Sequence, residues 1–192
     1  MKEAFAIVAT LLAVVGGLPY LSNVLKKRAQ PHPYTWMVSS IVSLITLFGM
    51  IVKGAGIGAL PTAVSEGFTI IIFLFSLRYG FKQIQKTDAL YLLIALGGVI
   101  PWVLTKDPTI SIVIAVGIDL ISFIPTLKKT WSYPETEKHS VYSMNVLRHI
   151  LTLFSLQTYN VATTLHSIAM IMLNTGMTFL IFRKHHVRKM SL

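Results

Sequence analysis

The chain has 192 residues, of which 54% are hydrophobic and only 12% are charged, and its mean hydropathy is +0.68. Soluble domains carry about 25% charged residues, so this composition excludes an ordinary soluble protein and predicts an integral membrane protein. The chain has no cysteine, which excludes disulfides and thiolate chemistry, and its formal net charge is +10.

Seven apolar segments follow one another along the chain, separated by short breaks rich in proline, glycine or charge. They cover residues 5–25, 35–52, 60–77, 88–104, 109–127, 140–157 and 159–182. Each is close to the length that a membrane-spanning helix needs, roughly 20 residues. No break is long enough for a soluble domain, so we expect a single all-α transmembrane domain over residues 1–192. The first segment has no clear cleavage site and is interpreted as an uncleaved span.

The basic residues gather on alternate connections between these segments. Thirteen of the 17 fall on one side: Lys26, Lys27, Arg28, Arg78, Lys82, Lys86, Lys128, Lys129, Lys138, Arg183, Lys184, Arg188 and Lys189. The other side has Lys2, Lys53 and Lys106, and Arg148 lies inside a segment. The positive-inside rule then places the N-terminus outside and the C-terminus in the cytoplasm. Because the charges follow topology, we expect no nucleic-acid partner, and the basic tail is expected to contact membrane lipid.

An internal repeat relates the first three segments to the last three. A shift of 106 residues places 44–49 on 150–155 and Pro19 on Pro125. Segment six has polar residues on one helical face, and segment two has polar residues at the same places. These are Asn145, Arg148, His149 and Thr152, matched by Ser39, Ser43 and Thr46. The third and seventh segments do not share this register.

The repeat predicts two parallel three-helix bundles joined by a linker helix, a 3+1+3 arrangement. The first bundle covers residues 1–82, the linker region 83–107, and the second bundle with its basic cytoplasmic tail 108–192. With the N-terminus outside, this arrangement resembles the SWEET and PQ-loop transporters. The local match is the stretch 125–131, Pro-Thr-Leu-Lys-Lys-Thr-Trp, followed by Pro134 and Ser140. Pro19-Tyr20 is a fainter copy, and neither copy has the glutamine of the family's Pro-Gln motif.

The resemblance implies alternating access, with Pro19 and Pro125 as hinges. A proline removes one backbone hydrogen bond and kinks a helix, although a proline that only shapes packing is an open alternative. Some SWEET transporters hold their sugar with an asparagine on the last helix of each bundle. Asn174 is the matching candidate here, but its counterpart in the first copy is Phe68.

Ionisable residues inside the apolar segments are the first candidates for a site. Asp119 lies about 15 Å along its segment, near the centre of a hydrocarbon layer roughly 30 Å thick. Arg148 lies at similar depth and stays charged, so an Asp119–Arg148 ion pair is the simplest expectation. An acid that only holds helices together is the alternative for Asp119.

These arguments give a set of residues expected to bind the solute. The set is Asp119, Arg148, Asn174, His149, Asn145 and Ser43. Asp119, Glu66 and His166 are candidates for proton coupling, since histidine titrates near neutral pH. A histidine used only as a hydrogen-bonded packing group is the competing interpretation, and facilitated diffusion competes with coupling.

The sequence thus predicts a multi-pass transporter of the plasma membrane that moves a polar solute, such as a sugar or an amino acid, through a central cavity. A non-transporting receptor or scaffold on the same fold is the alternative, and a homo-oligomer is left open. An enzyme is not expected, and neither are a cofactor or a metal, because the histidines lack a ligand-spaced partner. Trp36, Trp102 and Trp131 lie near segment ends and are assigned to the membrane interface.

Overall fold

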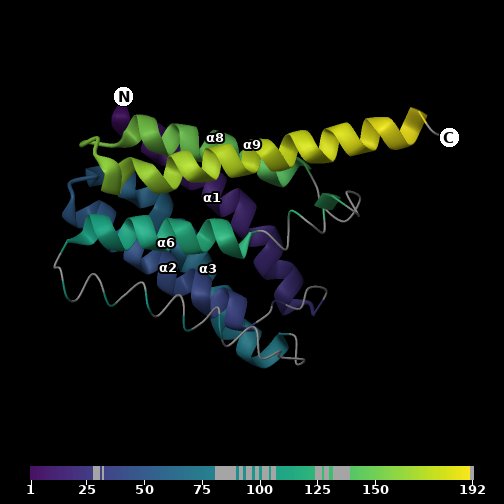
Figure 1. Cartoon of the computed structure of the whole chain (residues 1–192), viewed down its shortest axis with the longest axis horizontal. Helices are drawn as coiled ribbons and strands as arrows, with labels where there is room; N and C mark the ends of the chain where they lie inside the picture. Colours follow the sequence, from purple (N-terminus) through teal and green to yellow (C-terminus); the bar gives the residue numbers. More distant parts are fainter. Residues whose placement is uncertain are drawn as a thin grey trace.

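The fold is all-helical in the part of the chain that the structure, a computed structural model, describes (Figure 1). The described residues are 1–27, 31, 33–80, 90, 93, 97, 100, 104, 107–123, 127, 130–131 and 139–190. Their helices are α1 (Lys2–Leu25), α2 (Pro33–Val52), the 3₁₀ helix η1 (Gly56–Ala59), α3 (Leu60–Tyr79), α6 (Pro108–Ser122), α8 (His139–Ser155) and α9 (Val161–Met190). No strand occurs in these ranges, which confirms the expected all-α class.

Three helical stretches are long and apolar enough to cross a membrane, namely Lys2–Leu25, Gly56–Tyr79 and Val161–Arg183. Two further described stretches, Trp36–Val52 and Pro108–Ile121, are apolar but shorter. The predicted fourth segment lies mostly outside the described residues, although its five described positions are helical. The described helices are therefore compatible with a membrane protein.

The contacts between helices form a symmetric pattern. α3 packs against both α1 and α2, and α9 packs in the same way against both α6 and α8. The two groups of three meet where α1 packs on α8 and where α2 packs on α6. Exchanging α1 with α6, α2 with α8 and α3 with α9 leaves this pattern unchanged.

The starts of the helices follow the same relation. α6 begins 106 residues after α1, which is the shift found in the sequence. α9 begins 101 residues after α3, so the third helices leave the register where their polar faces also leave it. α3 and α9 therefore take equivalent places in the packing, although they are not related by the 106-residue shift.

Small residues on α1 allow its neighbours to approach closely. Ala6, Ala9 and Ala13 are buried along one side of the helix. An added Cβ at Gly17 would lie 2.6 Å from the ring of Phe68 on α3, so only glycine permits this contact. Small interface residues are a common way to bring membrane helices together.

At the end of the bundle that holds the N-terminus, two loops contact each other. The loop before η1 (residues 53–55) faces the loop after α8 (residues 156–160), and we call this region the N-terminal end. The backbone N–H of Gln157 donates to the carbonyl of Ala55 at 3.0 Å, and Asn160 Nδ2 donates to the carbonyl of Lys53 at 3.0 Å. Lys53 Nζ also lies 3.3 Å from Asp107 Oδ1, just before α6. These bonds join the two halves of the molecule.

At the opposite, C-terminal end, α1 and α3 finish and α2 and α8 begin. Figure 1 shows α9 continuing beyond the other helices toward the C-terminus. This end contains Lys26, Lys27 and Arg78 among the described residues. Pro125, the second expected hinge, lies outside the described residues, whereas α1 runs through Pro19 to Leu25.

Candidate functional site

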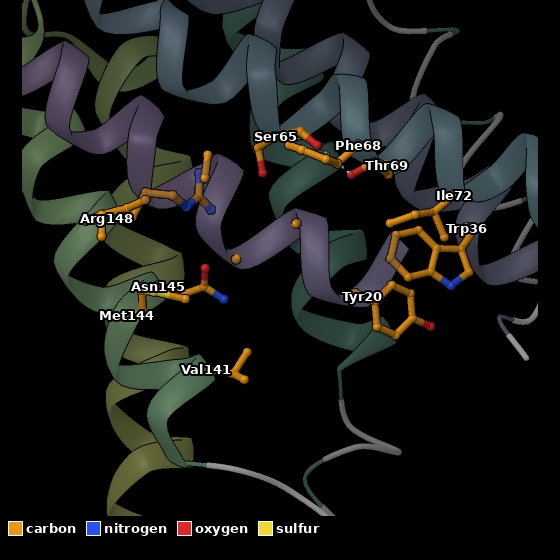
Figure 2. A pocket seen from close by; sticks show the side chains of 14 residues that line it. Tyr20, Trp36, Ser65, Phe68, Thr69, Ile72, Val141, Met144, Asn145 and Arg148 are labelled. Carbon is orange, nitrogen blue, oxygen red and sulfur yellow. Dashed lines mark hydrogen bonds between the residues drawn. The ribbon is translucent and has the colours of Figure 1, made fainter. Parts of the chain in front are cut away.

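A pocket of about 210 Å³ lies among α1, α3 and α8, with one wall from the start of α2 (Figure 2). It extends from the middle of these helices toward the C-terminal end. Its polar lining residues are Tyr20, Trp36, Ser65, Thr69, Asn145 and Arg148. Gly16 and Gly17 form part of its wall on α1, where a larger side chain would meet Met144 or Phe68. The pocket is smaller than the roughly 300–1,000 Å³ of drug-sized ligand sites, so it suits a small solute.

α8 presents Asn145 and Arg148 to this pocket. They are three residues apart and therefore share a face of the helix. Figure 2 shows both side chains extending from α8 toward α1. Arg148 is 9% exposed, and its Nη2 lies 2.8 Å from His149 Nε2. Since arginine only donates, His149 Nε2 accepts this bond and the imidazole is neutral in this geometry.

A chain of polar side chains runs from Arg148 away from the pocket. His149 Nδ1 lies 3.4 Å from the hydroxyl of Ser167 on α9, and the His149 and His166 rings meet edge to face at 5.5 Å. His166 Nε2 then lies 3.7 Å from Asp119 Oδ2 on α6. The chain thus connects the pocket with the far side of the bundle.

Glu66 on α3 completes this polar network. It is 5% exposed and lies beside Ser43 of α2, within electrostatic range of Arg148, His166 and Asp119. Its Oε2 has no hydrogen-bond partner among the described residues. Two acids, an arginine and two histidines therefore lie in one region, with Glu66, Arg148 and His149 buried and Asp119 and His166 half-buried, and with Ser43 five helices contribute to it. We call Ser43, Glu66, Asp119, Arg148, His149, His166 and Ser167 the buried polar network.

The contacts found among the described residues do not include the expected ion pair between Asp119 and Arg148. Asp119 lies beside His166. Arg148 is hydrogen-bonded to His149 and interacts electrostatically with Glu66. The reason is the order of the helices, because α9 separates α6 from α8. Counting residues along a segment gives the depth of a side chain but not the direction in which it points.

The other predicted site residues fall into three groups. Arg148 and Asn145 line the pocket, whereas Asp119, His149, Ser43, Glu66 and His166 belong to the buried polar network behind it. Asn174 is buried in α9, where its Nδ2 donates to the carbonyl of Met170 at 2.7 Å. It is not one of the residues that line this pocket.

Four polar pocket residues were not in the expected set. Ser65 and Thr69 are one helical turn apart on α3, so a polar face on that segment is the signal that could have found them. Trp36 was assigned to the membrane interface, but its ring stacks on Tyr20 at 5.3 Å and forms part of the pocket wall. A position near the end of a segment is compatible with the membrane interface and also with the pocket wall.

Metal binding finds no support in the ranges that the structure covers, where no group of three or more His, Cys, Asp or Glu residues could hold an ion. No family model, curated protein or solved structure matches this chain.

Proposed function

We propose that this chain is a plasma-membrane transporter of the SWEET/PQ-loop type, which moves a small polar solute by alternating access. Its two three-helix bundles are related as 3+1+3, with the N-terminus outside and the C-terminus in the cytoplasm. The observation that carries the proposal is a pocket lined by polar and apolar side chains that extends from mid-bundle to one end, while two loops are hydrogen-bonded to each other at the other end. The symmetric packing of α1–α3 and α6–α9 supports it.

The symmetry matters because alternating access needs two states of similar energy. Two parallel bundles can rock about their shared interface and exchange an opening at one end for an opening at the other. The contacts of α1 with α8 and of α2 with α6 would be the surfaces on which the bundles move. Pro19, between Gly17 and Tyr20 of the pocket wall, lies where a bend in α1 would change the pocket.

The buried polar network offers a place for a proton. Asp119, Glu66 and His166 can each gain or lose one, and the network connects them to Arg148 at the pocket. A proton moved between these groups would change the charge that the solute meets. We therefore include proton coupling in the proposal, with Asp119 as the principal carrier.

Solute exchange by the purified full-length chain in liposomes tests this function. A panel of labelled sugars, amino acids and organic acids should include at least one solute that exchanges faster than in protein-free liposomes. A folded, correctly inserted protein that exchanges none of them would instead favour a receptor or scaffold on the same fold.

The topology has its own test, made simple by the absence of native cysteines. Gln157→Cys lies at the N-terminal end and Lys26→Cys at the C-terminal end, and both positions are exposed. A membrane-impermeant thiol reagent should label Gln157→Cys from outside intact cells and Lys26→Cys only after lysis. Labelling of both from outside would contradict the proposed orientation.

A further inference from the structure

Arg148 is the one charged side chain among the described residues that line the pocket. The other lining residues are apolar or neutral polar, and none of them is acidic. Among the described lining residues, a solute in the pocket therefore meets one positive charge and no negative charge. This positive charge favours anionic solutes over neutral and cationic ones.

The guanidinium has donors left for a ligand. Arginine carries five N–H donors, and within the described ranges the hydrogen bond of the Arg148 guanidinium is the one to His149. Glu66 acts on it electrostatically, without an ion-pair contact among the described residues. Nevertheless the side chain is 9% exposed, so a buried cation faces the pocket with most of its donors open. A buried charge in this position is stabilised by a partner of opposite charge.

The neighbours of Arg148 extend this site. Asn145 lies one helical turn earlier, and its amide has no hydrogen-bond partner among the described residues. Thr69, in contrast, donates to the carbonyl of Ser65 at 3.1 Å. Phe68 and Ile72 give α3 an apolar surface along the same pocket. A bidentate donor, a free amide and an apolar wall fit a carboxylate, a polar substituent and a short carbon skeleton.

We propose that the solute is a small organic monocarboxylate that binds head-first, with its carboxylate on the Arg148 guanidinium and its polar substituent near Asn145. This inference rests on the proposed transport function and names its substrate class. A hexose offers no charge to Arg148. The ammonium group of an amino acid would find no carboxylate among the pocket-lining residues described.

The direct test compares each acid with its neutral amide on the unmodified full-length chain. Liposomes are loaded with two- to four-carbon monocarboxylates, for example lactate, or with the matching amide, lactamide. Exchange of labelled solute should be at least tenfold faster for an acid than for its amide and for glucose. Faster exchange of an amide or of glucose would overturn the carboxylate assignment and leave the transport function standing. No exchange of any solute by a folded protein would overturn both.

Substitutions of Arg148 test whether its charge binds the carboxylate. Arg148→Gln should reduce carboxylate exchange at least tenfold, and Arg148→Lys should restore part of it. Arg78→Gln, at an exposed position near the end of α3 outside the pocket, is the matched control and should leave exchange unchanged.

A second variant leaves Arg148 in place. Asn145→Asp puts a competing carboxylate beside the guanidinium at a half-buried position, so it should also lower exchange at least tenfold, whereas Asn145→Gln should not. Exchange of carboxylates at the unmodified rate by folded Asn145→Asp protein would show that Arg148 is not the anion site.

Discussion

The two ends of the bundle are built from different interactions. At the N-terminal end, two loops are joined by directional hydrogen bonds, and Gly54 and Gly56 adopt positive φ angles of 82° and 59° that few other residues tolerate. Toward the C-terminal end, the stacked rings of Tyr20 and Trp36 border a pocket. The first arrangement consists of hydrogen bonds with defined geometry beside a buried apolar cluster that includes Ala55 and Leu156, and the second of a stacked ring pair beside a cavity. Under the proposed transport function, the N-terminal end would be the end that has to unlock and the C-terminal end the one through which the solute enters.

The largest effect is expected from the network that lies between the two ends. Asp119→Asn removes the proposed proton carrier, which faces His166 directly and Glu66, Arg148 and His149 through the network. Exchange of solute at equal pH should continue, whereas accumulation driven by a pH gradient should disappear. Uptake into liposomes with and without an imposed gradient measures both. Equal transport by the unmodified protein in both conditions would show that the two ends alternate without a proton.

Adding one methyl group at the N-terminal end should destabilise the contacts there. A Cβ at Gly58 would lie 2.7 Å from the Cα of Leu156, a backbone atom that cannot turn away. Gly58→Ala should therefore lower the free energy of unfolding by about 1–3 kcal/mol, the usual cost of overpacking. Gly67→Ala on α3 is the matched control, because nothing lies within 4 Å of the added group. Equal melting temperatures for the two variants in detergent would mean that this end is not tightly packed.

A double-mutant cycle can separate the two candidate partners of Asp119. Asp119→Asn and His166→Gln remove groups that lie 3.7 Å apart, so their effects on unfolding should be non-additive by about 0.5–3 kcal/mol. The same cycle for Asp119→Asn and Arg148→Gln should give a smaller coupling energy, since α9 separates their helices. A larger coupling with Arg148 would restore the ion pair expected from depth alone.

The smallest expected effect concerns the beginning of α6. Asp107 Oδ1 accepts from the backbone N–H of Thr109 at 2.9 Å, and chiefly this bond, with Lys53 nearby, lowers the pKa of the carboxyl below its ordinary value of 3.8. A lowered pKa stabilises the fold at neutral pH, and this contribution is lost as the pH falls below 3.8 toward the pKa of the folded state. Asp107→Asn keeps a good N-cap residue but cannot lose a proton. The melting temperature of this variant should therefore fall less steeply between pH 6 and pH 3 than that of the unmodified protein. An unchanged pH profile would mean that Asp107 does not hold this end.

Much of this architecture follows from periodicity and hydropathy. The predicted segments that begin at residues 35, 60, 109, 140 and 159 correspond to helices that begin within a few residues of those positions. Depth along a helix was also informative for Asp119 and Arg148, which were expected at similar depth and both belong to the buried polar network. Apolar periodicity and depth are local properties of each segment, so they could be estimated without knowing which helices are neighbours.

The partners of these residues could not be predicted in the same way. Whether Asp119 meets Arg148 or His166 depends on α9 lying between α6 and α8, and nothing in a single segment encodes that order. The place of Trp36 depends on the approach of α1 to α2, where Tyr20 is its stacking partner. Asn174, the candidate taken from the family resemblance, does not line the described pocket, and its Nδ2 donates to a carbonyl of its own helix.

The central claim is that the N-terminal end must open for transport, and a reversible cross-link tests it most directly. A Cβ at Gly54 would lie 3.5 Å from the Cβ of Thr158, within the range of disulfides, roughly 3.5–4.5 Å. The chain has no other cysteine, so Gly54→Cys with Thr158→Cys forms one defined bond between the two loops. Each single variant is the control, and Gly54→Cys alone carries the same backbone strain. Oxidation should stop solute exchange in the double variant only, and reduction should restore it. Exchange at the same rate before and after complete cross-linking would contradict alternating access through this end.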